Sequence, residues 1–296
     1  MNYLLVINPV SGDVDKTEFI SKAKDLLERN GHRLEVFKTT GKNDGLRLEE
    51  KISELSPERI IAGGGDGTIL LCALAVKDVD IPMGIVPLGS ANVMAAELKI
   101  NSEPFEALKD ILMSSRYTDL DILKVNGEHY SIHIGDVGTN AEIVHKFELN
   151  EGRGMASYAK FFFEELRNSK PFVARIKTDG EEIEEKLVML AICNGRTYGT
   201  GIPINLKGNP GDGRFELVLI KEINLNALIK AGLSKFDERF FSEEGLEVIS
   251  TEKAEIHLKK EKTLQLDGEI IGKVKELKVE ILPAVVSLIV SRLENI

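Results

Sequence analysis

The chain has 296 residues, of which 43% are hydrophobic and 29% charged, and its formal net charge is −10. This length and apolar content suit one large domain or two smaller ones with a packed core, and they exclude a disordered or collagen-like chain. The acidic balance argues against nucleic acid as a general ligand and against attachment to anionic lipid through overall charge. Attachment to anionic lipid through a local basic patch stays open as an alternative.

Cysteine usage and the N-terminal segment indicate the compartment. Cys72 and Cys193 form no C-x-x-C motif, which disfavours a disulfide framework or a thiolate zinc site and makes the reducing cytoplasm the expected location. Residues 1–9 lack the basic region and the apolar length of a signal peptide. No apolar run approaches the roughly 18 residues that cross a bilayer. We expect a cytoplasmic protein without a transmembrane segment.

The first hundred residues alternate between strand and helix patterns. Short apolar runs end in Gly, Pro or Asn, and apolar residues recur at helical spacing between them. The expected elements, in order, are a strand at 3–7, a helix at 17–30 capped by Gly31, a strand at 33–37, a helix at 46–55, a strand at 59–62, a helix at 69–76, a strand at 81–86 and a helix to about 98. Such alternation predicts a parallel sheet covered on both faces, with ligands at the carboxyl ends of its strands.

The pattern changes after about residue 121 to short strand-like runs, several of them separated by Asn-Gly or Asp-Gly turn pairs. The expected strands lie at 123–125, 130–134, 173–177, 187–193, 215–220, 254–258, 263–266 and 274–281, with helices at about 157–168 and 225–234. We therefore predict a second, antiparallel β-rich domain with its boundary near residue 122.

The most informative motif is Gly63-Gly64-Gly65-Asp66-Gly67-Thr68, which follows a strand and opens a helix. Three glycines let the backbone approach a ligand, and the helix N-terminus favours an anion. A carboxylate beside a phosphate repels it unless a divalent cation lies between them, so Asp66 indicates nucleotide phosphates with Mg²⁺. The alternative is a β–α turn with a helix-capping aspartate.

Two further loops follow strands at what should be the same edge of the sheet. Asn8-Pro9-Val10-Ser11-Gly12 closes the first strand, and Pro87-Leu88-Gly89-Ser90-Ala91-Asn92 closes another. Each could be a capped turn by itself. Three loops that meet at one edge indicate a nucleotide site more strongly than any one of them.

These motifs, in this order, resemble the diacylglycerol kinase catalytic-domain family, especially its bacterial lipid kinases and their sphingosine-kinase relatives. Asn194-Gly195, Asp212-Gly213 and Leu266-Asp267-Gly268-Glu269 continue the resemblance over nearly the whole chain. The resemblance implies an ATP-binding α/β domain of NAD kinase/diacylglycerol kinase type at residues 1–122, with a C-terminal return at about 284–296. It implies a β-sandwich-like substrate-side domain at 123–283, with the active site between the two.

The resemblance also implies site residues, ATP and Mg²⁺ as cofactors, and a role in lipid metabolism and phospholipid biosynthesis. Asp66 would lie near the Mg²⁺ of ATP, and Glu269 would be the general base. A structural Mg²⁺ would be held by the side chain of Asp212 and the main chain of Asn209 and Arg214. By the resemblance, the ATP-binding residues would be Thr39, Ser90 and the loop Gly65–Leu71, which includes Asp66, Gly67 and Thr68. The convergence of the three loops adds Asn8, Ser11, Gly64 and Asn92 as candidate nucleotide-binding residues. The substrate would be a lipid hydroxyl at the membrane surface, reached by peripheral association, and a homodimer is left open.

The sequence Asp-Gly-Glu occurs twice. Asp179-Gly180-Glu181 lies in a charged run and predicts an exposed hairpin turn. Asp267-Gly268-Glu269 is flanked by Leu264, Leu266, Ile270 and Ile271, so we expect Glu269 to be buried at the start of a strand, where its pKa can rise and it can serve as a base.

Departures from the family pattern keep two alternatives open. Leu70 and Leu71 stand where many members have Asn-Glu, and Val93 and Ala96 stand where members often carry Asp and Arg. Diacylglycerol specificity is therefore not transferred. The alternatives to a lipid kinase are a kinase for a soluble acceptor, such as an NAD kinase, and a nucleotide-binding regulator without enzymatic activity.

Overall fold

The computed structural model describes residues 1–12, 15–138, 162, 166–199, 201–221 and 245–291. The helices predicted at 157–168 and 225–234 lie largely or wholly outside these residues. The chain divides into two compact units, Met1–Asp121 with Pro283–Ile296 and Ile122–Leu282, and the strands β5 and β16 each contribute residues to both.

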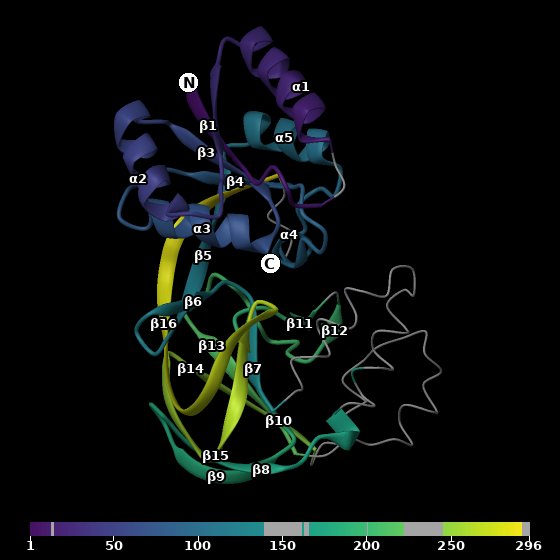
Figure 1. The fold of residues 1–296 in the computed structure, drawn as a ribbon, viewed down its shortest axis with the longest axis vertical. Coiled ribbons are helices and arrows are strands. Elements are labelled where there is room, and N and C mark those ends of the chain that lie inside the picture. Colours follow the sequence, from purple (N-terminus) through teal and green to yellow (C-terminus); the bar gives the residue numbers. More distant parts are fainter. Residues whose placement is uncertain (13–14, 139–161, 163–165, 200, 222–244, 292–296) are drawn as a thin grey trace. The chain divides into compact units, whose positions relative to one another are not determined.

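The first unit is built on a parallel sheet in the order β4–β3–β1–β2 (Figure 1). The strands are β1 (Asn2–Ile7), β2 (Arg33–Lys38), β3 (Arg59–Gly64) and β4 (Met83–Pro87). Every residue of β3 and β4 is buried, as expected for a parallel sheet with helices on both faces. Leu288 of β16 (Glu269–Val290) extends this sheet by pairing with Met83.

Helices cover both faces of this sheet (Figure 1). They are α1 (Lys16–Arg29), α2 (Asp44–Leu55), α3 (Asp66–Val76), α4 (Val93–Glu97) and α5 (Pro104–Met113). Alternate β1 side chains, Tyr3, Leu5 and Ile7, share a core with α1 and α5. The predicted C-terminal cap of α1 is confirmed, because Gly31 adopts a φ of +74° and its N–H donates to the Glu28 carbonyl.

The second unit is an antiparallel β structure. Its strands are β5 (Arg116–Val125), β6 (His129–Ser131), β7 (Ile134–Val137), β8 (Phe172–Thr178), β9 (Glu182–Leu187), β10 (Met189–Cys193), β11 (Thr197–Tyr198), β12 (Ile202–Pro203), β13 (Phe215–Ile220), β14 (Leu246–Thr251), β15 (Lys253–Leu266) and β16. The order β14–β13–β10–β7–β15–β16 forms its main sheet, while β8 and β9 add to β15. The predicted fold class, a parallel-sheet α/β domain with a β-sandwich-like second domain, is confirmed.

The long strand β15 connects two parts of this second unit. Its first half pairs with β8 and its last residues pair with β7, with irregularities in its pairing to β16 between His257 and Lys262 and between Leu264 and Gln265. Along the first half, inward and outward side chains alternate, so that Ala254, Ile256 and Leu258 are buried. The carboxyl end of β15 thus reaches the Asp267-Gly268 turn.

Candidate functional site

Three loops meet at the carboxyl edge of the parallel sheet in the first unit. A Cβ added at Gly12, whose φ is +59°, would lie 2.6 Å from the Leu88 carbonyl oxygen. A Cβ added at Gly89 would lie 2.5 Å from the Cα of Gly65, and the Leu88 N–H donates to the Gly64 carbonyl over 3.2 Å. Only glycine fits where the backbones approach this closely. The structure therefore brings together the three loops that were singled out from the sequence.

Lys16 joins two of these loops and was not singled out from the sequence. It is the first residue of α1, is only 8% exposed, and its ammonium group donates to the carbonyl oxygens of Ser11 and Leu88, the latter over 2.9 Å. A lysine this well buried needs several acceptors. No sequence pattern predicts this role, because a lysine after the N-capping Asp15 is typical of an exposed first turn.

The glycine-rich loop leads directly into α3. The N–H groups of Thr68 and Ile69 donate to the Gly65 carbonyl, and a Cβ at Gly64 would lie 2.2 Å from the Thr68 hydroxyl oxygen. Gly67 is different, since among the described residues no heavy atom beyond its chain neighbours and the backbone of its own helix lies within 4 Å of an added Cβ. The first turn of α3 is thus open on one side, at the end of the helix where the dipole favours an anion.

Asp66 has partners within the protein. Its two carboxylate oxygens accept hydrogen bonds from the backbone N–H groups of Val93 and Met94, over 3.1 and 2.7 Å. These are the first residues of α4, so Asp66 caps the helix of the neighbouring loop rather than its own. Each carboxylate oxygen of Asp66 therefore has a hydrogen-bond donor within the protein, and its role near Mg²⁺ stays a prediction.

The other predicted nucleotide ligands surround the same edge. Thr39 follows β2, and its N–H donates to the Ile7 carbonyl. The Asn8 side chain accepts from the Val10 N–H, while its carbonyl accepts from the Ser11 hydroxyl. Asn92 exchanges two hydrogen bonds with the Gly89 backbone, over 2.9 and 2.7 Å, and so shapes its loop. Ser90 is exposed.

The four departures from the family pattern lie in the same unit. Leu70 and Leu71 are half-buried in α3. Val93 is half-buried and Ala96 is exposed. None of these side chains carries a hydrogen-bonding or charged group.

In the second unit, the expected burial of Glu269 is wrong. Glu269 is exposed, as is Ile270 beside it, whose relative exposure is 60%. The enclosed carboxylate of the motif is instead Asp267, which accepts hydrogen bonds from the Ser131 hydroxyl and from the N–H groups of Ile132, His133 and Ile134 over 2.7–3.2 Å. Burial raises the pKa of Asp267, and the bonds from Ser131, Ile132 and His133 oppose this rise.

The reason for this error is the geometry of the turn. Asp267 and Gly268 have φ values of +48° and +89°, so they form a tight two-residue hairpin between β15 and β16. The turn directs the Asp267 side chain toward the β6–β7 connection and leaves the following residues outside. The apolar residues that flank Glu269 in the sequence therefore did not predict its exposure.

The predicted structural Mg²⁺ ligands lie in one short turn. The Asp212 side chain is exposed and accepts a hydrogen bond from the Arg214 N–H over 3.0 Å, while the Asn209 carbonyl lies 3.4 Å from the Asp212 nitrogen. One carboxylate and two carbonyls in a turn are the oxygen donors that Mg²⁺ prefers, so the residues present fit this ion. Among the described residues no cluster of three or more His, Cys, Asp or Glu side chains could hold a metal ion, so waters would complete such a site.

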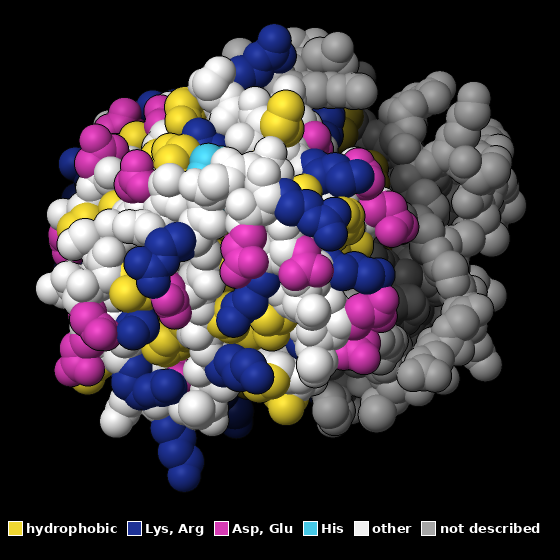
Figure 2. All heavy atoms as spheres, turned by 90° about the horizontal axis from the view of Figure 1, so that it is seen from above, with side chains coloured by type: hydrophobic (Ala, Val, Ile, Leu, Met, Phe, Trp, Pro, Cys, Tyr) yellow, Lys and Arg dark blue, Asp and Glu magenta, His cyan; other side chains and the backbone are white. Residues whose placement is uncertain are grey.

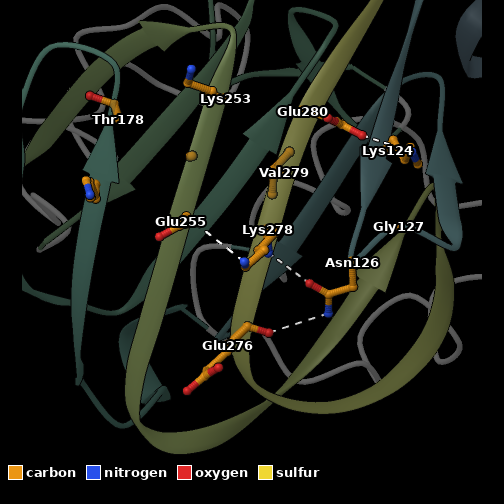
Figure 3. Close-up of a pocket in the computed structure, with 12 residues that line it drawn as sticks. Lys124, Asn126, Gly127, Thr178, Lys253, Glu255, Glu276, Lys278, Val279 and Glu280 are labelled. Carbon is orange, nitrogen blue, oxygen red and sulfur yellow. Dashed lines mark hydrogen bonds and ion pairs between the residues drawn. The ribbon is translucent and has the colours of Figure 1, made fainter.

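A groove of about 730 Å³ on the second unit is not part of the predicted site (Figure 3). Its walls carry charged side chains of both signs from β5, β8, β15 and β16. Lys124 pairs with Glu280 and Lys278 with Glu255, over 3.0 and 3.6 Å. Charges of both signs that pair in this way are typical of a solvated sheet face.

The charges on the face in Figure 2 are also mixed: Lys and Arg side chains lie interspersed with Asp and Glu. A phosphate backbone would need a continuous basic surface. Within the part of the chain that the structure describes, no helix is long and apolar enough to cross a membrane.

Comparison with known proteins gives the family. Residues 2–125 match the model described as the diacylglycerol kinase catalytic domain. Residues 131–290 match the model described as the YegS C-terminal NAD kinase beta sandwich-like domain. The chain therefore belongs to the family of diacylglycerol kinase catalytic domains that carry a YegS-type C-terminal domain.

Curated relatives of nearly equal length agree with this assignment. A "Probable lipid kinase YegS-like" protein of Yersinia enterocolitica is 30% identical over 95% of this chain and 94% of its own. A diacylglycerol kinase of Bacillus subtilis is 23% identical over 90% and 89%. The chain is thus similar to lipid kinases, a class of phosphotransferases, along almost its entire length.

Solved structures share the fold. A diacylglycerol kinase from Bacillus anthracis matches with a TM-score of 0.73 at 20% identity, covering 97% of this chain and 96% of that one. An NAD kinase from Archaeoglobus fulgidus, solved in complex with ATP, matches with a TM-score of 0.56 at 15% identity, covering 99% and 94%. The resemblance expected from the sequence is confirmed for both family and fold.

Proposed function

We propose that the chain is an ATP- and Mg²⁺-dependent lipid kinase that transfers the γ-phosphate of ATP to a hydroxyl group of a lipid at a membrane surface. The single observation that carries the nucleotide part is the convergence of three glycine-containing loops at one edge of the parallel sheet, where Gly67 opens the first turn of α3. Membership of a kinase family supports the transfer reaction, and the names of its relatives support a lipid acceptor.

In this proposal the first unit binds and orients the triphosphate. Backbone groups at the start of α3 and the loops at Asn8–Gly12 and Leu88–Asn92 surround the phosphates, with Thr39 and Ser90 as further polar groups. Mg²⁺, when bound, would neutralise phosphate charge and hold the phosphates in line for displacement. Lys16 and Asp66 maintain the shape of the loops through their bonds to Leu88, Val93 and Met94.

Glu269 supplies the base. As the acceptor hydroxyl oxygen attacks the γ-phosphorus, the Glu269 carboxylate takes the hydroxyl proton, and ADP leaves with the electrons of the broken bond. Because Glu269 is exposed, its carboxylate is solvated and accessible to a substrate hydroxyl. The structural Mg²⁺ of the Asp212 turn would stabilise the second unit and takes no part in the transfer.

A labelling assay separates this function from its alternatives. The protein is incubated with radiolabelled ATP, Mg²⁺ and a total lipid extract, and in parallel with NAD. Label in the organic phase supports the lipid kinase, and label in NADP supports the soluble-acceptor kinase. Nucleotide binding without transfer to either would instead support a regulator without catalytic activity.

A glycine pair tests the nucleotide site. Gly67→Ala places a methyl group where, among the described residues, nothing beyond its chain neighbours and the backbone of its own helix lies within 4 Å, so the fold should tolerate it while a phosphate at this turn would be displaced. Gly45→Ala, in the first turn of α2, meets equally open space and is the matched control. We expect ATP affinity, measured by calorimetry, to fall at least about 10-fold in Gly67→Ala only. Equal affinity in both variants would exclude ATP from the first turn of α3.

A further inference from the structure

The second unit contains a fully buried carboxylate that the proposed reaction does not use. Asp136 lies on β7 with no exposed surface, and its Oδ2 accepts hydrogen bonds from the Tyr198 hydroxyl, over 2.7 Å, and from the Gln265 side-chain amide. Gln265, only 4% exposed, lies directly opposite Asp136 in the β7–β15 pairing. An ionisable group at such a position is retained only with good partners.

Gln265 transmits the position of Asp136 to the hairpin turn. Its amide nitrogen donates to Asp136, and its amide oxygen accepts the Gly268 N–H over 2.8 Å. The amide nitrogen also lies 3.4 Å from the Tyr198 hydroxyl oxygen, which itself donates to Asp136. Because the two ends of an amide differ in hydrogen bonding, the carboxylate acceptor at Asp136 favours the orientation in which the amide oxygen faces the turn and accepts from Gly268.

The turn is held a second time from its other side. The Asp267 N–H donates to the Ile134 carbonyl, and the Asp267 carboxylate accepts four hydrogen bonds from residues 131–134. Glu269 comes next in the chain and, among the described residues, its side chain forms no hydrogen bond or ion pair. The backbone of the turn before it therefore sets the point from which the Glu269 side chain extends.

We infer that Asp136, acting through Gln265, is a positioning residue for Glu269. The inference rests on the proposed function, in which Glu269 accepts the proton. A misplacement of about 1 Å at a reacting group can lower the rate strongly, whereas nucleotide binding depends on other residues. The hydrogen-bond acceptor at Asp136 sets the rate of transfer and leaves ATP affinity unchanged.

The test compares Asp136→Ala, Asp136→Asn and Gln265→Leu, assayed with radiolabelled ATP, Mg²⁺ and mixed micelles of the lipid extract used in the labelling assay. We expect Asp136→Ala and Gln265→Leu to lower kcat about 10-fold or more with the KM for ATP within about twofold of wild type. Asp136→Asn keeps an acceptor oxygen and should restore most of kcat. Hydrogen exchange of the Gly268 amide should quicken in Gln265→Leu.

Two controls separate positioning from general destabilisation. Ile192→Ala, at a buried position of β10 next to β7, should lower Tm comparably and leave kcat near wild type. In a Glu269→Gln background, Gln265→Leu should cause no further loss, because the base it positions is absent. The inference is overturned if Gln265→Leu has the kcat of the wild type. It is also overturned if Gln265→Leu lowers kcat as much in the Glu269→Gln variant as in the wild type. Wild-type kcat in Glu269→Gln alone overturns the proposed base instead.

Discussion

The second unit contains the sequence Asp-Gly-Glu twice, and the two turns differ in almost every physical respect. Asp179 is exposed and pairs with Lys253 over 3.1 Å. Asp267 accepts four hydrogen bonds from a neighbouring segment. In the first turn the Thr178 hydroxyl accepts long bonds from Gly180 and Glu181, over 3.4 and 3.3 Å. The comparison shows that the same three residues form different contacts because of what surrounds them.

The surroundings follow from the strands that each turn connects. The turn at Asp179 joins β8 to β9, and β9 lies at an edge with outward glutamates. The turn at Asp267 joins β15 to β16, beside the buried strand β7. In the second turn the aspartate carboxylate accepts from the backbone N–H groups of a neighbouring segment, residues 132–134, whereas in the first turn the N–H groups of Gly180 and Glu181 donate to the Thr178 hydroxyl. Asp267 is therefore structural, and the turn sets the backbone position from which the Glu269 side chain extends.

The largest expected difference is in activity. Glu269→Gln removes the proposed base and should lower the rate of phosphoryl transfer by about 10² or more, with ATP binding retained. Glu181→Gln is the same change in the other turn and should alter the rate less than about twofold, since Glu181 is exposed beside a turn with no proposed role. Initial rates with radiolabelled ATP give both values. Similar losses in the two variants would contradict the assignment of the base.

The next difference is in stability. Asp267→Ala leaves the Ser131 hydroxyl and three backbone N–H groups without their acceptor, and each such group costs about 1–3 kcal/mol when it stays buried. The free energy of unfolding should fall by at least about 2 kcal/mol. Asp179→Ala should change it by no more than about 0.5 kcal/mol. Urea denaturation measures both, and a small loss in Asp267→Ala would mean that water replaces the carboxylate.

Much of the fold could be predicted because its signals are local. The strands β1, β3 and β4 are apolar runs ended by Asn-Pro or glycine, and alternation with helices implies a parallel sheet. From the sheet alone it follows that their loops meet at one edge. The resemblance to a known family then added the residue roles, which no local pattern supplies.

Other elements were missed because tertiary contacts override the pattern. The helix α5 and the strands β9 and β14 were not predicted. β9 is a charged run that forms a strand because it pairs with β8, and its apolar side chains in the core are Leu187, which is buried, and Ile183, which is partly buried. The two predicted segments at 254–258 and 263–266 are one strand, β15, which changes its pairing partner midway.

The site residues that could not be predicted are those whose partners are distant in sequence. Lys16 reaches the Leu88 carbonyl 72 positions away, and Asp136 reaches Gln265 129 positions away. The hydrogen bonds that Asp66 accepts from α4, 27 and 28 positions on, also leave no mark in the local sequence, whereas its place near Mg²⁺ stays a prediction. A charged residue in a predicted loop therefore needs a structure before its function can be separated from its structural role.

A smaller effect distinguishes the two turns by pH. Burial raises the pKa of Asp267 above its ordinary value, so between the unfolded and folded pKa values the folded protein binds more protons than the unfolded one. Protonated Asp267 therefore makes its full contribution to stability at pH values below its pKa in the unfolded chain. This contribution is lost as pH rises through its pKa in the folded protein. The difference in unfolding free energy between wild type and Asp267→Asn should shrink over this interval. A constant difference across pH would show that the carboxyl has the same pKa in both states.

The smallest expected effect belongs to the exposed turn. Asp179 and Lys253 form an ion pair whose side chains are 42% and 74% exposed, so solvent and salt screen it. A double-mutant cycle with Asp179→Asn and Lys253→Met should give a coupling of about 0.2–1 kcal/mol that declines toward zero in 1 M salt. A coupling free energy that persists in high salt would show that the Asp179–Lys253 contact is desolvated. The environments of Asp179 and Asp267 would then differ only in degree. Because Asp179→Asn leaves the turn bonded through Thr178, the transfer rate should stay at the wild-type value throughout.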